Sequence, residues 1–219
     1  MNRRSRDRAA GVTSVLIVRH GETTWGAAGR YAGQVDVPLT DLGRRQSRQV
    51  ARRLAPLAAD VVLTSPLDRC RATAEAIAAS ASARRGPRCE VRVDERLTDQ
   101  SLGEWTGRSE TEIAGRWPAD FRRWRDDVHA APPAGESLAD LRVRCVAATE
   151  QAVDGHRGKS IVVVSHAAPI RALLTWALGT PVDVAYRLRV DNASVSGVLV
   201  DPQGATTVWT INETGHLLG

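Results

Sequence analysis

Residues 16–25 read LIVRHGETTW, and this stretch decides the fold. The apolar run at residues 15–18 has the length and composition of a buried strand, and Arg19, His20 and Gly21 follow it without a break. A glycine at this turn lets another group approach the backbone closely. An imidazole beside a fixed positive charge at a strand end can handle a phosphoryl group, provided that the chain supplies further cations and a proton donor.

Strand patterns and helix patterns alternate along the rest of the chain. Strands are predicted at residues 15–18, 60–64, 90–93, 161–165, 195–200 and 207–211, and helices from residue 40 or 41, from 65–66, over 137–153 and from 169. The stretch 98–133 is predicted to be rich in loops. This alternation predicts an α/β fold with three layers, α/β/α, around a mostly parallel central sheet.

Particular residues support these helix predictions. Thr40 or Asp41 can cap a helix whose inner face carries Val50, Leu54 and Leu57. The pair Ser65–Pro66 has the N-cap and N1 pattern of a helix start. In the loop-rich stretch, four aromatic residues are interpreted either as a hydrophobic cap over one end of the sheet or as a substrate lid: Trp105, Trp117, Phe121 and Trp124.

Polar residues gather at the carboxyl ends of three predicted strands, where ligands bind in such sheets. Arg19 and His20 follow the first strand, Ser65 precedes Arg69 by four residues, and His166 follows the strand at 161–165. The planar guanidinium groups of the arginines match the geometry of a phosphate, and free backbone N–H groups at helix starts also favour an anion. His20 can attack phosphorus if it is neutral and its other ring nitrogen donates to a carbonyl or carboxylate.

Length and composition bound the organisation. With 219 residues and a net charge of +5, we expect a disordered basic leader at 1–13 and a single domain at 14–219. No long apolar run follows the leader, so neither a signal peptide nor a membrane helix is predicted. Three separated cysteines suit reduced thiols in a cytoplasm, and the absence of CxxC and HExxH motifs argues against a metal site.

Six blocks of sequence occur in a recognisable order: RHGETTW at 19–25, GRYAGQVDVPLTDLGRRQ at 29–46, SPLDRCRATAEAI at 65–77, LTDQSLGEWTG at 97–107, GES at 135–137 and SHAAPIRALL at 165–174. Together they resemble the histidine phosphatase superfamily, whose fold is phosphoglycerate-mutase-like. The resemblance spans about residues 14–215. The short gap between the fourth and fifth blocks is similar to the broad-specificity phosphatase branch.

The resemblance implies roles for matching positions. His20 is similar to the nucleophile that forms a phosphohistidine, and Asp99 falls where the family usually carries a glutamate as general acid. His166 completes the implied catalytic set. Five residues are implied to bind substrate together with these: Arg19, Arg69, Thr23, Gly33 and Ala167.

Three departures from the family pattern bear on activity. Asp99 is shorter than glutamate by one methylene, about 1.5 Å of reach, and Glu104 is an alternative acid nearby. Gly26 stands where relatives often carry an asparagine that contacts phosphate. Ala167 replaces the usual glycine after the second histidine, which adds bulk to the pocket wall.

The expected function is hydrolysis of a small phosphomonoester by a metal-independent enzyme without a cofactor, with an acid-shifted or bell-shaped pH profile. A phosphoglycerate-type mutase and a catalytically weakened phospho-ligand binding module remain the alternatives. We expect no nucleic-acid partner and no membrane association. A homodimer is the favoured assembly on frequency alone.

Overall fold

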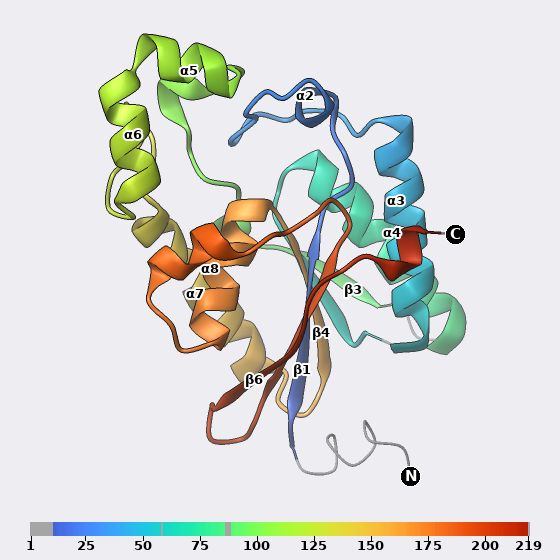
Figure 1. The fold of residues 1–219 in the computed structure, drawn as a ribbon. Helices are drawn as coiled ribbons and strands as arrows, with labels where there is room; N and C mark the ends of the chain where they lie inside the picture. Colours follow the sequence, from blue (N-terminus) through green and yellow to red (C-terminus); the bar gives the residue numbers. More distant parts are fainter. Residues whose placement is uncertain (1–10, 58, 86–88, 219) are drawn as a thin grey trace.

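The fold is built around a six-stranded sheet with the order β3-β2-β4-β1-β5-β6. The computed structural model describes residues 11–57, 59–85 and 89–218, and Figure 1 shows its arrangement. The strands are β1 (Thr13–Arg19), β2 (Val61–Thr64), β3 (Glu90–Val93), β4 (Ser160–Ser165), β5 (Val195–Val200) and β6 (Thr206–Glu213). The first four pair in parallel, whereas β5 pairs antiparallel with both of its neighbours, β1 and β6. The prediction of a mostly parallel sheet is confirmed.

Helices cover both faces of this sheet, as predicted. The helices are α2 (Thr24–Ala27), α3 (Asp41–Leu54), α4 (Asp68–Arg85), α5 (Glu110–Arg116), α6 (Pro118–Asp126), α7 (Leu138–Gly155) and α8 (Ala167–Ala177). Val15 and Ile17 of β1 point into a core with α7 and α8, while Leu16 and Val18 point into a second core with α3 and α4. Alternate residues of a strand face opposite sides, so one unbroken apolar run serves both cores.

Most helix boundaries follow the predicted signals. The Thr40 hydroxyl accepts from the Gly43 N–H at the start of α3, and Ser137 caps α7 in the same way. One helix start is wrong, because α4 begins at Asp68 and not at the Ser65–Pro66 pair. The Ser65 hydroxyl accepts the Leu67 N–H at 3.4 Å, ahead of the helix, and makes a shorter contact of 2.8 Å with the His166 ring. Likewise α8 begins at Ala167, earlier than predicted.

The loop-rich interpretation of residues 98–133 is wrong in part, since α5 and α6 form there. Ser109 and Glu112 make a reciprocal capping box at the start of α5, and Pro118 occupies the first turn of α6. Both signals are visible in the sequence, but helices of seven and nine residues give too short a pattern to stand out by periodicity. The aromatic residues of this region pack on one another in a small core of their own.

The predicted basic leader falls largely on residues 1–10, which lie outside the described residues. Its last residue does not belong to a leader, because Thr13 is the first residue of β1 and is 1% exposed. Within the described ranges, no helix combines the length and apolar character needed to cross a bilayer.

Candidate active site

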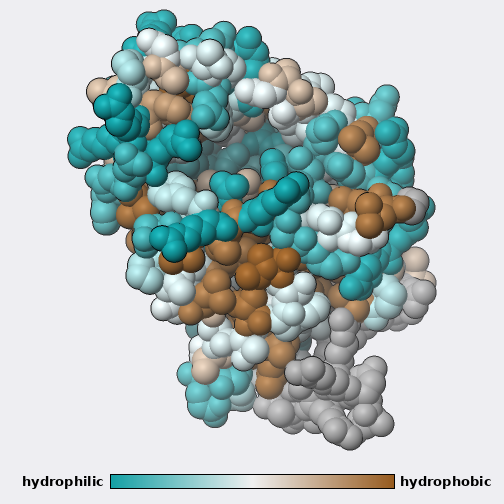
Figure 2. Space-filling view, viewed as in Figure 1, coloured by the Kyte–Doolittle hydropathy of each residue, from teal (hydrophilic) through white to brown (hydrophobic). Residues whose placement is uncertain are grey.

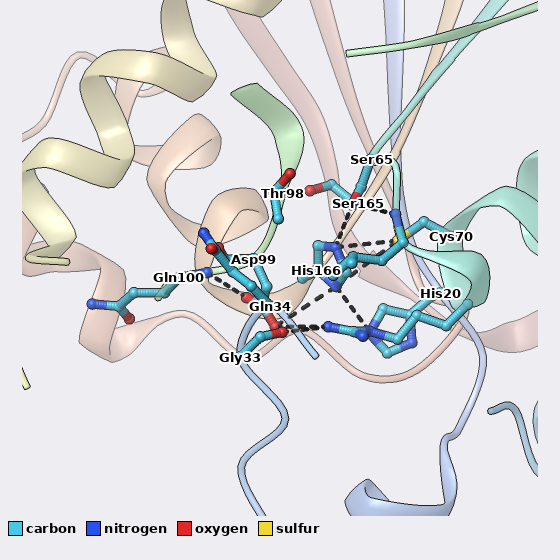
Figure 3. A network of polar contacts seen from close by, with 12 residues as sticks. His20, Gly33, Gln34, Ser65, Cys70, Thr98, Asp99, Gln100, Ser165 and His166 are labelled. Carbon is cyan, nitrogen blue, oxygen red and sulfur yellow. Dashed lines mark hydrogen bonds and ion pairs between the residues drawn. The ribbon is translucent and has the colours of Figure 1, made fainter. Parts of the chain in front are cut away.

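The candidate site lies at the carboxyl ends of three adjacent parallel strands. β4 lies between β1 and β2, and Arg19 is in register with Ser165. His20 therefore follows β1 directly beside His166, which follows β4, and the two rings meet edge to face with centroids 5.1 Å apart. Ser65 follows β2 on the other side of β4. The predicted meeting of these three strand ends is confirmed, and Figure 3 shows the resulting cluster.

His20 is held in one tautomer. Its Nδ1 donates to the Gly21 carbonyl at 2.7 Å, so Nε2 carries the lone pair. Burial, followed by the charges of Arg19 and Arg69, holds the pKa of His20 well below its usual range. The imidazole is therefore neutral at pH 7, which is the state that a nucleophile requires.

Gly21 meets a close approach, but from the protein itself. A Cβ on Gly21 would collide with the backbone of Gly43 in α3, and a Cβ on Gly43 would collide with Glu22. The two glycines let α3 press against the turn that carries His20. The glycine of the RHG triplet thus holds the strand end against a helix, which keeps His20 in place.

His166 is fully buried and neutral. Its Nδ1 accepts a hydrogen bond from Arg69 Nε at 3.2 Å, so Nε2 holds the proton and donates to the Ser65 hydroxyl at 2.8 Å. The Cys70 sulfur lies 3.4 Å from the same nitrogen. Burial and the surrounding charges, including His20 and Arg69, hold the pKa of His166 well below its usual range. His166 lies behind the cavity wall and is not among the described residues that line the cavity.

Arg69 is also buried, and most of its donors already have partners. Besides the bond to His166, it donates to the Val35 carbonyl at 2.8 Å and to the Gly33 carbonyl at 2.7 Å. A guanidinium has five N–H groups, and a fourth donates to Asp99 Oδ2 over a longer distance of 3.5 Å, so one N–H group is left without a partner for a ligand. Arg69 is therefore a rigid, preoriented cation that can still bind an anion.

Arg19 has an unused donor. One of its terminal nitrogens donates to the Val190 carbonyl at 2.7 Å, while its buried Nε has no partner among the described residues. Burial lowers the pKa of Arg19, although the nearby Asp99 opposes this. An unpaired buried donor beside His20 is costly in isolation and favours an anionic ligand.

Asp99 places a carboxyl group beside the Arg69 guanidinium and the neutral His166 ring. Its Oδ2 lies 3.5 Å from Arg69 and 3.6 Å from His166 Nδ1, and its Oδ1 accepts the backbone N–H of Gln100. About one fifth of the side chain is exposed, toward the cavity. Burial raises the pKa of Asp99 from its ordinary value, with Arg69 opposing. This shift favours a proton donor. Glu104, the alternative acid, is exposed and is not among the residues that line the cavity.

Arg144 positions the backbone around Asp99. Its guanidinium donates to the carbonyls of Arg96, Thr98 and Asp99 at 2.7–2.9 Å, and it forms a two-pronged ion pair with Glu136 at 2.7 and 2.8 Å. Arg144 lies on α7, 45 residues from Asp99 along the chain. Sequence reasoning missed this residue, because nothing in its local pattern distinguishes it from other helix arginines.

These groups open into a cavity of about 590 Å³. Figure 2 shows a recess in the same region, between the part formed by α5 and α6 and the part around α2. The lining includes predicted site residues together with aromatic and arginine side chains that were not predicted as site residues: Arg19, His20, Thr23, Gly33, Arg69, Asp99, Ala167, Arg30, Tyr31, Arg125, Arg171 and Tyr186. Phe121 and Trp124 line it as well, and both also pack against Trp105 in the small core of this region.

The remaining predicted site residues have defined places. The Thr23 hydroxyl accepts from the Gly26 N–H at 3.2 Å and caps α2, and both residues line the cavity. Gly33 has a φ of +52°, which only glycine adopts readily, and its carbonyl holds Arg69. Ala167 is the first residue of α8, where backbone N–H groups are free to meet an anion.

The arrangement suits transfer of a phosphoryl group. A neutral imidazole nitrogen, one buried and one partly buried arginine and a carboxyl group of raised pKa lie on one cavity wall. Among the described residues, no group of three or more His, Cys, Asp or Glu side chains is placed to hold a metal ion.

Comparison with known proteins points the same way. The sequence model of the histidine phosphatase superfamily (branch 1) matches residues 15–213. The bifunctional protein Rv2228c of Mycobacterium tuberculosis is 36% identical over 206 residues, covering 94% of this chain and 55% of that protein. This chain therefore spans about half the length of that relative. Phosphoserine phosphatase 1 of Hydrogenobacter thermophilus is 32% identical, covering 94% of this chain and 95% of that protein.

A solved structure agrees with these sequence relatives. The mycobacterial glucosyl-3-phosphoglycerate phosphatase Rv2419c in complex with VO3 superposes with a TM-score of 0.81 at 27% identity. The match covers 92% of this chain and 99% of that one.

Proposed function

The chain belongs to the histidine phosphatase superfamily (branch 1), and from this membership we propose that it hydrolyses a small phosphomonoester through a phosphohistidine on His20. The observation that carries the proposal is the tautomer of His20. Its Nδ1 donates to Gly21, its pKa is depressed, and its free Nε2 belongs to a ring that lines the cavity beside two arginines. A neutral nitrogen nucleophile next to fixed cations is what attack on a phosphate ester needs.

In the first step, the Nε2 lone pair forms an N–P bond while the bond from phosphorus to the ester oxygen breaks. Asp99 gives its proton to the departing oxygen, which leaves as an alcohol. In the second step, the Asp99 carboxylate takes a proton from water, whose oxygen forms a bond to phosphorus. The N–P bond breaks, and its electron pair returns to His20. The products are the alcohol and inorganic phosphate.

Cations stabilise the charge on the phosphoryl oxygens during both steps. Arg19 has an unpaired Nε–H, and Arg69 has one N–H group without a partner and another that makes only a 3.5 Å contact to Asp99. The free N–H groups at the start of α8, including that of Ala167, add a further anion site. His166 supports this wall from behind, since it orients the Arg69 guanidinium and packs against the His20 ring.

The reaction as written uses no metal ion and no cofactor. Candidate substrates are small phosphorylated metabolites, and phosphoserine and glucosyl-3-phosphoglycerate are the first to try, because relatives are named for them. Transfer to a second hydroxyl, as in a mutase, is the main competing outcome.

The test is to trap the covalent intermediate. The enzyme is mixed with a ³²P-labelled aryl phosphate, quenched in alkali, which preserves phosphohistidine, and digested to locate the label. We expect label on His20 and turnover that survives dialysis against a chelator. His20→Ala is expected to lower the turnover number on the order of 10³-fold or more. Unchanged hydrolysis by this variant would refute the proposal.

Two further measurements separate the alternatives. Conversion of 3-phosphoglycerate to 2-phosphoglycerate that depends on a bisphosphate primer would identify a mutase. Tight phosphate binding without labelling or turnover would identify a binding module.

A further inference from the structure

The cavity extends well beyond the phosphoryl-transfer groups. At about 590 Å³ it has the size of a pocket that encloses a whole small molecule. Its outer part is lined by Tyr31, Trp124 and Tyr186, and by three arginines: Arg30, Arg125 and Arg171. The reaction itself needs only the inner wall, so the outer wall is available to the part of the substrate that leaves.

Two of these three arginines have acidic partners within the protein. Arg30 forms an ion pair with Glu112 at 3.0 Å and also donates to the Gly107 carbonyl at 2.6 Å. Arg125 forms an ion pair with Glu110 at 3.4 Å, and its side chain is 61% exposed. Their charges are therefore balanced or solvated without any ligand.

Arg171 differs from both. It lies in the middle of α8, and its Nε is buried without a hydrogen-bond partner. Within the described part of the chain, no ion pair or hydrogen bond joins the Arg171 side chain to another residue. Burial lowers its pKa, with Tyr31 opposing. Burial also raises the pKa of Tyr31, so this phenol is uncharged at pH 7 and does not neutralise Arg171.

An unpaired, partly buried guanidinium at a cavity wall is unfavourable unless a ligand supplies the opposite charge. Arg171 is four residues beyond Ala167, so it lies about 6 Å further along the axis of α8. A ligand whose phosphate meets the start of α8 and whose body extends along the helix therefore brings its far end to Arg171.

We propose that Arg171 binds a second anionic group of the substrate, a carboxylate or a second phosphate, and so selects phosphomonoesters that carry one. This inference rests on the proposed function and names the substrate class. The body that joins the two anionic groups lies against Tyr31, Trp124 and Tyr186. The planar guanidinium, with its N–H donors, can bind a carboxylate or a phosphate equally well. The experiment therefore tests both anionic groups.

The experiment compares substrates that differ only in the second group. One set is phenyl phosphate, 4-carboxyphenyl phosphate and 1,4-phenylene bisphosphate. A flexible set is glycerol 3-phosphate, 3-phosphoglycerate and glycerol 1,3-bisphosphate. For each set, the readout is the ratio of kcat/KM for the doubly anionic substrate to that for the singly anionic one, in the wild type, in Arg171→Gln and in Arg125→Gln.

We expect the wild type to prefer a doubly anionic substrate in at least one set. Arg171→Gln is expected to lower that ratio about 10- to 100-fold, mainly through KM, because a charge-assisted bond to the substrate is lost. Arg125→Gln serves as the matched control, since Arg125 lines the same cavity but is paired with Glu110, and it is expected to shift the ratio less than about threefold. Whether the carboxylate or the bisphosphate shows the effect identifies the group.

Either of two results overturns the inference. One is a wild-type enzyme that hydrolyses phenyl phosphate but shows no preference in any set, and the other is an Arg171→Gln ratio equal to the wild-type ratio. If the wild type hydrolyses none of these esters, the proposed function fails, and the inference about Arg171 falls with it.

Discussion

Replacing Arg144 by lysine tests how the general acid is positioned. Arg144 makes five short hydrogen bonds, three to the carbonyls of Arg96, Thr98 and Asp99 and two to the Glu136 carboxylate. A lysine keeps the positive charge but has three donors on one nitrogen, so it leaves at least two of these acceptors without a partner.

The expected loss follows from these contacts. An acceptor left unsatisfied costs about 1–3 kcal/mol, and water recovers part of this because Arg144 and Glu136 are 21% and 19% exposed. Two lost bonds then destabilise the fold by roughly 2–4 kcal/mol, which lowers Tm by about 4–16 °C for a chain of this length. Because the carbonyl of Asp99 itself is released, the carboxyl group also loses its alignment.

The assay pairs thermal unfolding with kinetics on two substrates. An aryl phosphate has a good leaving group and needs little proton donation, whereas an alkyl phosphate depends on it. We expect Arg144→Lys to lower kcat for the alkyl ester about 10- to 100-fold and for the aryl ester much less. Arg142→Lys is the control, because Arg142 lies on the same helix and makes no hydrogen bond to the Asp99 segment within the described residues. Equal losses on both substrates, or an unchanged Tm, would refute this reasoning.

Three further predictions follow from the titrating groups. With alkyl phosphates, the wild-type rate is expected to fall as pH rises through the raised pKa of Asp99, and to fall at acid pH only below the depressed pKa of His20, so a maximum above pH 8 would contradict these directions. Asp99→Asn is expected to lower kcat for alkyl phosphates about 10²- to 10⁴-fold and to remove the alkaline limb, as pH profiles of the variant will show. The free energy of unfolding, measured in urea, is expected to fall by up to about 1.4 kcal/mol per pH unit for each of His20 and His166 below pH 6.5, because both are neutral when folded and bind protons when unfolded. His20→Gln is expected to make the free energy of unfolding depend less steeply on pH below 6.5. An unaltered slope would contradict the assignment of a neutral His20 in the folded state.

Much of the fold was accessible from local pattern. Apolar runs of strand length and capping residues such as Thr40 and Ser137 predicted most of the elements, because strands and helix starts depend on near neighbours. The wrong predictions concern helices too short to show periodicity and a residue whose side chain can serve two roles. The helices α5 and α6 are short. The Ser65 hydroxyl contacts His166, although its sequence context predicted a helix cap.

For the candidate site, the positions of residues could be predicted from the sequence, but their protonation and hydrogen-bond partners could not. His20, His166 and Arg69 could be placed at one sheet edge from the sequence, since each follows or lies close to the end of a predicted strand. Their states could not be predicted. That His166 lies behind the cavity wall, and that four of the five Arg69 donors are already occupied, depends on partners 30 to 97 residues away along the chain.

The order of the strands and of the longer helices, and the residues that follow the strand ends, could thus be predicted from the sequence, because these depend on periodicity and on neighbouring residues. Which charges have partners depends on the packing of distant segments. This packing pairs Arg125 with Glu110 and Arg144 with Glu136, and it leaves Arg171 with none among the described residues. Along the chain all three are helix arginines. The cost of burying an uncompensated charge, which exists only once distant segments have packed, is what distinguishes Arg171 from the others.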